Sequence, residues 1–209
     1  MIEAPTTIVK ALFLDYDGTI SPIGASKSNS AVLPDNEVVL RKISQKIPVA
    51  VITTKDLHFI VKRTPFAHAW AGMAGLEIRR LNTLKKRTCV EQTHPHMAAA
   101  LNHAAALAGG GLKIEKKQLS DGTAIAFSVD WRQAENNSSA RERASQIMTY
   151  CEALKLFTIK YEKQPFFDVF PCPVDKGKAL LDLKKELGLL DGVLYMGDSI
   201  LDNSAFEAA

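Results

Sequence analysis

The chain has 209 residues, 46% of them hydrophobic, so it can bury a sizeable core and form one large or two small domains. The net charge is only +3 and the basic residues are scattered, which excludes a basic stripe of the kind that binds nucleic acid. No run of about 18 apolar residues and no signal-peptide pattern occurs, so we expect neither a membrane span nor secretion. Cys89, Cys151 and Cys172 are far apart and in no CxxC spacing, which argues against a disulfide framework and a structural zinc site and indicates a reducing, cytoplasmic compartment.

The first part of the chain alternates between apolar strands and amphipathic helices. We predict strands over residues 8–16 and 47–54, because both are continuous apolar runs typical of strands covered on both faces. Helices are predicted over 33–46 and 55–64 from the helical spacing of their apolar residues, and a loop rich in Gly, Ser and Asn separates the first strand from the first helix. This order predicts a doubly wound, parallel sheet with right-handed crossovers.

The middle of the chain follows a different pattern, and the first pattern returns near the end. A helix is predicted over 175–190 and a buried strand over 192–198. Between them and the first part, antiparallel strands are predicted over 111–119, 123–131, 156–163 and 166–171, with helices over 94–108 and 134–155. We therefore predict an α/β core domain, residues 1–80 and 172–209, with an inserted α+β cap domain, residues 81–171.

Three of the buried strands predicted for the core end in polar residues. Asp15 and Asp17 follow the first, Thr53 lies at the end of the second, and Asp198 follows the last. Because ligands bind at the carboxyl ends of strands in doubly wound sheets, we expect these residues to line one crevice. Ionised carboxylates a few Å apart repel by about 3 kcal/mol per pair, so the site requires a cation or protonation of a carboxylate. Oxygen ligands favour Mg²⁺ over zinc. With Lys176 at the start of a helix whose N–H groups suit a phosphate, these residues indicate a phosphoryl-transfer site.

The same residues resemble the four signatures of the haloacid dehalogenase-like phosphohydrolases. The signatures correspond here to "DYDGT", to "VITT", to "VDKGKAL" and to "GDSILDNSAF", in the order found in that superfamily. The insert lies between the second and third signatures, as in the sugar-phosphatase branch. The resemblance implies a doubly wound core with an α+β cap.

Within that branch the chain is most similar to the trehalose-6-phosphate phosphatases. The likeness extends over "FLDYDGTISPI", "WAGMAGLEIRR", "IEKKQL" with "IAFSVDWR", and "YEKQPFFDVFPCPVDKGKALLDL". The chain departs from that family at several positions, which leaves the phosphatase chemistry intact and leaves the sugar open. Thr54-Lys55 replace Gly-Arg, Ala74 and Leu76 flank Gly75 where His-Gly-x is usual, Asp130-Trp131 replace His-Tyr, and Asp168 and Phe170 replace Glu and Arg.

The resemblance implies a two-step hydrolysis at a magnesium site. Asp15 would be the nucleophile that forms an aspartyl-phosphate. Asp17 would protonate the leaving sugar oxygen and then activate water. Mg²⁺ would be held by Asp15, the backbone carbonyl of Asp17, and Asp198.

Further residues would support this site. Thr53 and Lys176 would bind the phosphoryl oxygens, and Asp202 would orient either Lys176 or a metal-bound water. Gly18 and Thr19 belong to the first signature and have a supporting role. In the cap, candidates for contacts to sugar hydroxyl groups are Glu115, Lys117, Arg132, Lys163 and Asp168.

Other functions stay open at this point. The substrate is expected to be a small sugar phosphate, either trehalose 6-phosphate or another such as sucrose phosphate or a glycosyl-phosphoglycerate. A catalytically silent sugar-phosphate binding module would use the same crevice, although it would not need both Asp15 and Asp17. The chain ends at Ala209, where the family adds a further strand and helix, so we expect the core domain to be incomplete on its C-terminal side.

Overall fold

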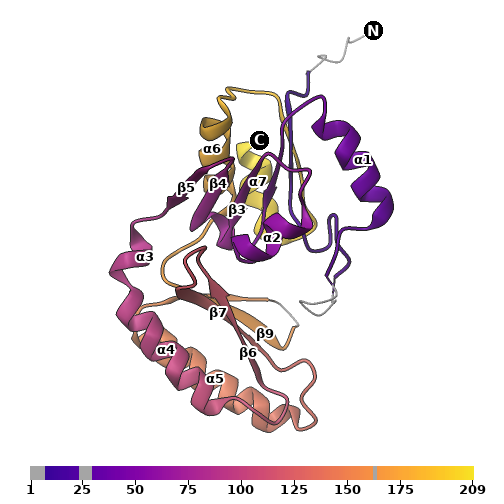
Figure 1. Cartoon of the computed structure of the whole chain (residues 1–209). Helices are drawn as coiled ribbons and strands as arrows, with labels where there is room; N and C mark the ends of the chain where they lie inside the picture. The colour runs from indigo at the N-terminus through magenta and orange to yellow at the C-terminus, as the bar shows by residue number, and fades with distance from the viewer. Residues whose placement is uncertain (1–7, 24–29, 162–163) are drawn as a thin grey trace. The chain divides into compact units, whose positions relative to one another are not determined.

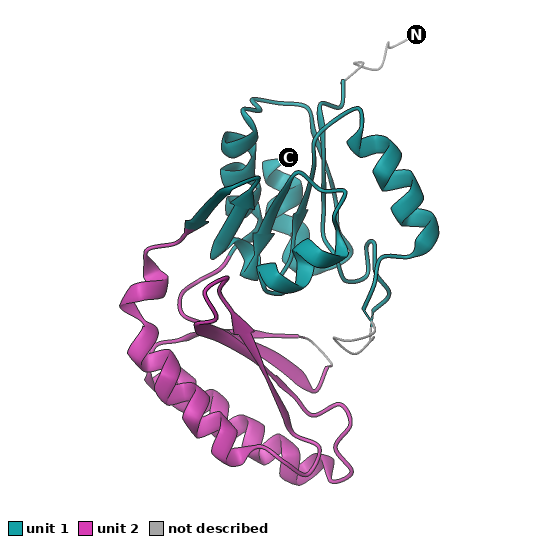
Figure 2. Cartoon of the chain, in the orientation of Figure 1, with its two compact units in different colours: residues 1–85, 175–209 teal, residues 86–174 magenta. Residues whose placement is uncertain are grey.

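The computed structural model describes residues 8–23, 30–161 and 164–209 (Figure 1). The chain forms two compact units, one of Met1–Lys85 with Asp175–Ala209 and the other of Lys86–Val174 (Figure 2). The sequence placed the boundaries a few residues earlier, at 80 and 171. The difference at the first boundary arises because one further strand, over Thr83–Lys86, continues the core sheet beyond residue 80.

The first unit is built on a six-stranded sheet of order β10-β1-β2-β3-β4-β5. Strands β10, β1, β2 and β3 run parallel, whereas β4 runs antiparallel to β3. The predicted parallel sheet is thus confirmed, and the antiparallel β4 was not predicted. Because β1 lies between β10 and β2, the chain segments that follow these three strands emerge at the same sheet edge. The strands are β1 (Ala11–Leu14), β2 (Val49–Ile52), β3 (Ala69–Gly72), β4 (Glu77–Arg80), β5 (Thr83–Lys86) and β10 (Val193–Met196).

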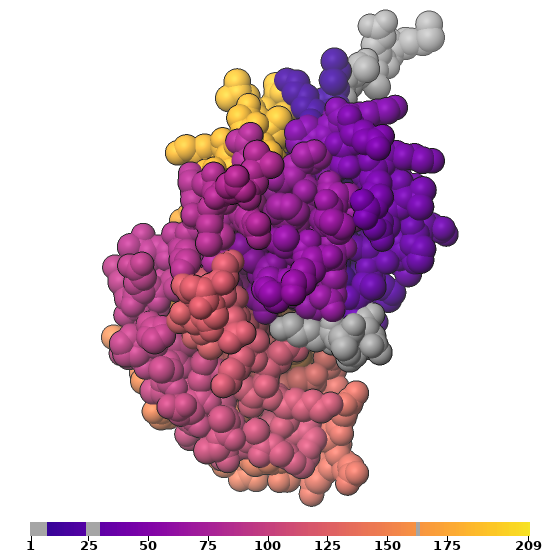
Figure 3. Space-filling view, viewed as in Figure 1, coloured from indigo at the N-terminus to yellow at the C-terminus, as the bar shows by residue number. Residues whose placement is uncertain are grey.

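Helices cover both faces of this sheet. Helices α1 (Pro34–Ser44) and α2 (Leu57–Arg63) pack on the face that carries Leu12 and Leu14 of β1. The opposite face carries Ala11 and Phe13 and is covered by α6 (Lys176–Leu187) and α7 (Asn203–Ala208). Alternate residues of β1 therefore point to different cores, as the two-residue repeat of a strand requires. In the space-filling view, N-terminal (indigo) and C-terminal (yellow) residues form one continuous surface of this unit (Figure 3).

The second unit is an antiparallel sheet of order β6-β7-β9-β8 with helices on one face. Its core joins apolar residues of the two long helices to Phe127 and Phe167 of the sheet, so the insert has a hydrophobic core of its own. The predicted α+β insert is confirmed. Its elements are α3 (Cys89–Gln92), α4 (His94–Leu107), β6 (Lys113–Gln118), β7 (Ala124–Asp130), α5 (Asn137–Ala153), β8 (Phe157–Lys160) and β9 (Phe166–Phe170).

The two ends of the second unit lie side by side and are joined covalently. Arg87 Nη1 donates to the carbonyl of Pro173 at 3.2 Å, and Cys89 and Cys172 form a disulfide across 83 positions of sequence. The sequence argued against a disulfide framework, and for this pair that prediction was wrong. Spacing along the chain does not show which distant segments fold together, whereas here the two Cα atoms lie 6.3 Å apart, within the range for a disulfide.

Cys151 is a free thiol in the core of the second unit, and burial raises its pKa to about 12. Such a thiol is unreactive at neutral pH because the thiolate is the nucleophilic form.

Among the helices that the structure describes, none is long and apolar enough to span a membrane.

Candidate active site

The segment after β1 holds two carboxylates at the carboxyl edge of the core sheet. The backbone N–H of Asp15 donates to the carbonyl of Met196 at 2.9 Å, which continues the pairing of β1 with β10 by one residue. The chain then turns tightly, because the N–H of Gly18 donates to the carbonyl of Ser21 at 2.7 Å. Asp15 is buried, with 6% of its surface exposed, and Asp17 on the turn is half-buried. The two carboxylates therefore have different environments, although they are two residues apart.

Gly18 allows the turn to approach the last strand closely. Its φ of +82° lies in the left-handed region, where glycine is favoured. A Cβ atom at this position would lie 1.9 Å from Oδ2 of Asp198. Asp198 follows β10 and is exposed. The glycine therefore makes the room that the Asp198 carboxylate occupies beside the turn.

Lys176 is the first residue of α6 and connects two of the acidic residues. Its Nζ atom lies 2.8 Å from Oδ1 of Asp15 and 2.7 Å from Oδ1 of Asp202. All three side chains are buried, and Asp202 has no exposed surface. The helix start is fixed by Asp175, whose carboxylate accepts the N–H of Lys178 at 2.7 Å. This N-cap places Lys176 at a defined position in the site.

The pKa values of the two buried carboxylates, Asp15 and Asp202, are shifted in opposite directions. Burial raises the pKa of Asp15 to about 6, and the neighbouring Lys176 only partly offsets that effect. Burial would also raise the pKa of Asp202, but Lys176 and hydrogen bonds from Tyr195 and Ser199 lower it below its ordinary value. For Lys176, burial alone would lower the pKa, and the two carboxylates raise it instead. Asp202 and Lys176 therefore form the stable ion pair, and Asp15 carries the less favourable buried charge.

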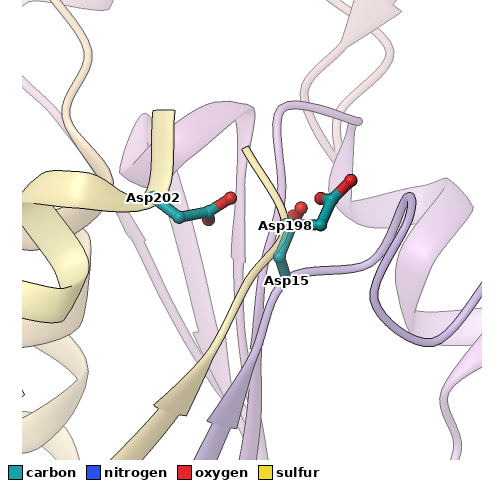
Figure 4. A group of neighbouring side chains, drawn as sticks. All are labelled: Asp15, Asp198 and Asp202. Carbon is teal, nitrogen blue, oxygen red and sulfur yellow. The ribbon is translucent and has the colours of Figure 1, made fainter. Parts of the chain in front are cut away.

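Three carboxylates converge closely enough to hold a cation. Asp15, Asp198 and Asp202 each offer one oxygen, and these oxygens lie within 4.8 Å of one another. Figure 4 shows Asp15 and Asp198 at the ends of the neighbouring strands β1 and β10, with Asp202 on the segment that leads into α7. This all-oxygen donor set fits a hard cation such as Mg²⁺.

Asp202 differs from the other two carboxylates because both of its oxygens accept hydrogen bonds. Oδ1 accepts from Lys176 and from the hydroxyl of Tyr195, and Oδ2 accepts from the N–H of Ser199 at 3.0 Å and from its hydroxyl at 2.8 Å. These four donors occupy the lone pairs that a metal would need. Asp15 and Asp198 are therefore better placed to be metal ligands than Asp202.

Thr53 ends β2 and is almost fully buried. Its backbone N–H donates to the carbonyl of Ala71 at 3.0 Å, and its carbonyl accepts the N–H of Ala74 at 2.8 Å. Its hydroxyl oxygen accepts the N–H of Lys55 at 3.2 Å. Within the described parts of the chain this proton has no acceptor, so it is available to a ligand.

Lys55 contacts the site although it was not among the candidates from the sequence. Its Nζ atom lies 3.3 Å from Oδ2 of Asp17. The available signal was the replacement of Arg by Lys at this position of the second signature.

In the first signature, the hydroxyl oxygen of Thr19 is buried and has no hydrogen-bond partner among the residues that the structure describes.

In the second unit, two of the cap candidates form a buried ion pair. Lys117 Nζ lies 2.7 Å from Oδ1 of Asp168, and both side chains are almost fully buried. Asp168 also accepts hydrogen bonds from the hydroxyl groups of Ser128 and, at 2.8 Å, Tyr161. Glu115 pairs in register with Ser128, which pairs with Asp168, so these residues share the sheet face opposite the helices. The sequence did not single out Ser128 or Tyr161.

The remaining cap candidates lie elsewhere or outside the description. Arg132 is exposed and pairs with Asp130, with a distance of 2.8 Å between Nη2 and Oδ2. It is thus not part of the Lys117–Asp168 network. Lys163 lies outside the residues that the structure describes.

Solved structures identify the class of fold. A haloacid dehalogenase-like hydrolase from Bacteroides thetaiotaomicron superposes with a TM-score of 0.70 at 15% identity, over 96% of this chain and 86% of that one. The C-terminal domain of Candida albicans trehalose-6-phosphate phosphatase superposes with a TM-score of 0.77 at 16% identity, over 97% of this chain and 73% of that one. The chain therefore has the haloacid dehalogenase-like fold with an inserted cap, as predicted.

Sequence comparison identifies the family within that class. The trehalose-phosphatase family model matches residues 13–209, and the chain belongs to this family. The trehalose-phosphate phosphatase of Mycobacterium leprae (strain TN) is 26% identical over 218 residues, which cover 95% of this chain and 47% of that protein. The chain thus spans about half the length of the trehalose-phosphate phosphatases that it matches. The resemblance stated from the sequence signatures is confirmed at the level of the family.

Proposed function

We propose that this chain is a Mg²⁺-dependent phosphatase that hydrolyses a sugar phosphate, with trehalose 6-phosphate as the favoured substrate. The observation that carries the proposal is the buried Asp15 at the end of β1, contacted by Lys176 and close to Asp198, in a member of the trehalose-phosphatase family. A sugar-phosphate binding module would need a cation and a lysine, but it would not need the second carboxylate, Asp17, beside the first.

In the first proposed step, a carboxylate oxygen of Asp15 attacks phosphorus and the bond from phosphorus to the sugar oxygen breaks. Asp17 gives its proton to that oxygen, so the sugar leaves as a neutral alcohol. In the second step, Asp17 takes a proton from water, the water oxygen attacks phosphorus, and the bond to Asp15 breaks. Inorganic phosphate is released, Asp15 is again a free carboxylate, and Asp17 again carries its proton.

The surrounding residues would hold the phosphoryl group. Lys176 would balance the charge of Asp15 and bind a phosphoryl oxygen, with Asp202 fixing its ammonium group. The Thr53 hydroxyl would donate to a second oxygen. A Mg²⁺ ion held by Asp15, Asp198 and the Asp17 carbonyl would supply positive charge against the carboxylates and the phosphoryl oxygens.

We further propose that the cap recognises the sugar through Glu115, Lys117, Arg132, Lys163 and Asp168. Because Lys117 and Asp168 already bind each other, their remaining donor and acceptor positions would be presented in a fixed orientation. Hydrolysis of a different sugar phosphate is the second candidate. The pairing of Arg132 with Asp130 favours it, because the family has His where Asp130 stands.

A cytoplasmic location remains part of this proposal. The Cys89–Cys172 disulfide is unusual for that compartment, where most thiols stay reduced. A fluorescent fusion of the chain, expressed in its native host, should fill the cytoplasm, and export of the fusion would contradict this location.

The test is a phosphate-release assay over a panel of sugar phosphates, with Mg²⁺ and with a chelator. We expect release that requires Mg²⁺ and is lost in Asp15→Asn, while Asp35→Asn, at an exposed position on α1, retains wild-type activity. Absence of turnover for every member of the panel, with binding still measurable by calorimetry, would favour the binding module. Full activity of Asp15→Asn would refute the assignment of the nucleophile.

A further inference from the structure

We propose that Lys55 is a positioning residue that holds the carboxylate of Asp17 for proton transfer. The proposal rests on the proposed phosphatase function, in which Asp17 serves first as acid and then as base. The ion pair between Lys55 Nζ and Asp17 Oδ2 measures 3.3 Å, and no role for this lysine follows from the mechanism described above.

The backbone of Lys55 is fixed beside the phosphate-binding candidate Thr53. Its N–H donates to the Thr53 hydroxyl oxygen at 3.2 Å, and its carbonyl accepts the N–H of Met73 at 2.7 Å. The next residue, Asp56, caps α2 by accepting the N–H of Phe59 at 2.8 Å. Hydrogen bonds on both sides of Lys55 thus restrict the position of its backbone, from which the side chain extends.

The side chain of Lys55 is also restricted. Only 19% of it is exposed, and Nζ lies 5.0 Å from the ring centroid of the buried Phe59, within the range of a cation–π contact. That ring packs edge-on against Tyr16, the neighbour of Asp17 in sequence, with centroids 5.7 Å apart. The ammonium group is therefore held near Asp17 by packing, unlike the freely moving partner of a surface ion pair.

Asp17 needs such a partner because its own setting is open. Its side chain is 39% exposed and lies on a turn, and its other side-chain contact among the described residues is a long one, 3.5 Å from the Ser30 hydroxyl to Oδ1. A side chain that gives a proton to a leaving oxygen and then takes one from water has to be oriented, and a displacement of about 1 Å can cost about 100-fold in rate. The ion pair with Lys55 restricts the orientation of the Asp17 side chain.

A direct role for Lys55 in binding phosphate would leave a different kinetic signature. A lysine that binds phosphoryl oxygens contributes to affinity, so its loss would raise KM and weaken binding of inorganic phosphate. A lysine that orients Asp17 contributes to the proton transfers, so its loss would lower kcat and leave phosphate affinity unchanged.

The experiment compares Lys55→Met, Lys55→Arg and the control Lys62→Met, which removes an exposed lysine of the adjacent helix α2. For the best sugar phosphate of the panel, we expect Lys55→Met to lower kcat by about 100-fold, with KM and the dissociation constant of inorganic phosphate within about twofold of wild type. Lys55→Arg keeps the charge and should recover kcat to within about tenfold, while Lys62→Met should match wild type. An unchanged kcat, or a rise in KM and in the phosphate dissociation constant at constant kcat, would overturn the proposal.

Two readouts separate this proposal from failure of the proposed function. With p-nitrophenyl phosphate, whose leaving group needs no proton, Lys55→Met should still give a pre-steady-state burst of p-nitrophenol at the wild-type rate, followed by slow turnover. Should the wild type hydrolyse no sugar phosphate, the phosphatase proposal fails, and crystal structures decide the role of Lys55. There Asp17 should leave its wild-type rotamer in Lys55→Met and keep it in Lys55→Arg, and an unmoved Asp17 in Lys55→Met would refute the positioning role.

Discussion

Replacing Asp15 with Asn should stabilise the chain while it abolishes turnover. Asp15 is 6% exposed, and the single ammonium group beside it is shared with Asp202. Asn keeps the size of the side chain and an oxygen that can accept from Lys176, but it removes the buried charge. Because the ion pair of Lys176 with Asp202 remains, the substitution leaves no unpaired buried ammonium group.

The size of the effect follows from the pKa of Asp15. Burial raises that pKa from 3.8 to about 6, a difference of about 2 pH units, and each unit corresponds to about 1.4 kcal/mol. The folded state therefore binds this proton more tightly than the unfolded state. The stability that the protonated form contributes is fully present below pH 3.8 and is lost as the pH rises through about 6. The gain from Asp15→Asn should accordingly be about 3 kcal/mol at pH 8 and about half of that at pH 5.

The assay is urea unfolding followed by circular dichroism at pH 5 and pH 8, in a chelator and without phosphate. Asp198→Asn is the matched control, because Asp198 belongs to the same acidic group but is exposed, and its free energy of unfolding should change by less than about 0.5 kcal/mol. Both variants should lose phosphatase activity, and Mg²⁺ should stabilise the wild type more than either of them. No gain for Asp15→Asn at pH 8, or a gain that is the same at both pH values, would refute the reasoning from buried charge.

Three further predictions concern other parts of the chain. Gly18→Ala places a Cβ 1.9 Å from Oδ2 of Asp198 on a backbone with φ of +82°, so it should cost about 1–3 kcal/mol and weaken the Mg²⁺-dependent thermal shift; an unchanged shift would contradict the close approach. Lys117→Met leaves Asp168 buried without its cation and should cost about 3–5 kcal/mol in urea unfolding, whereas adding Asp168→Asn should recover part of that loss, and additive losses would show that the two residues do not interact. Cys89→Ser and Cys172→Ser should each lose about 4 kcal/mol, with no further loss in the double variant, and the unfolded, unreduced wild type should show one reactive thiol, rising to three after reduction. Three reactive thiols before reduction would exclude the disulfide.

The class of fold could be predicted from the sequence because it depends on short-range patterns. The continuous apolar run before Asp15 is typical of a strand that is covered on both faces, and the spacing of apolar residues over 33–46 follows the helical repeat. Both patterns are visible without a structure. The signatures around Asp15, Thr53, Lys176 and Asp198 were equally local, so the family could be recognised. Strands β3 to β5 were not predicted. The chain between β3 and β4 adopts positive φ at Met73 and Ala74, which no periodic pattern marks, and the residues of β5 are exposed.

The pairings within the candidate site were decided by the tertiary structure. The order β10-β1-β2 places Asp15 between the segments that carry Asp198 and Thr53, although Asp198 lies far along the chain. The same folding joins Lys55 to Asp17 and Cys89 to Cys172, and none of these contacts follows from spacing in sequence. The sequence alone thus determined which chemical groups the chain carries and the class of fold that holds them. Only the tertiary structure decided which of these groups form ion pairs or a disulfide, because burial and distance act between residues that are neighbours in space.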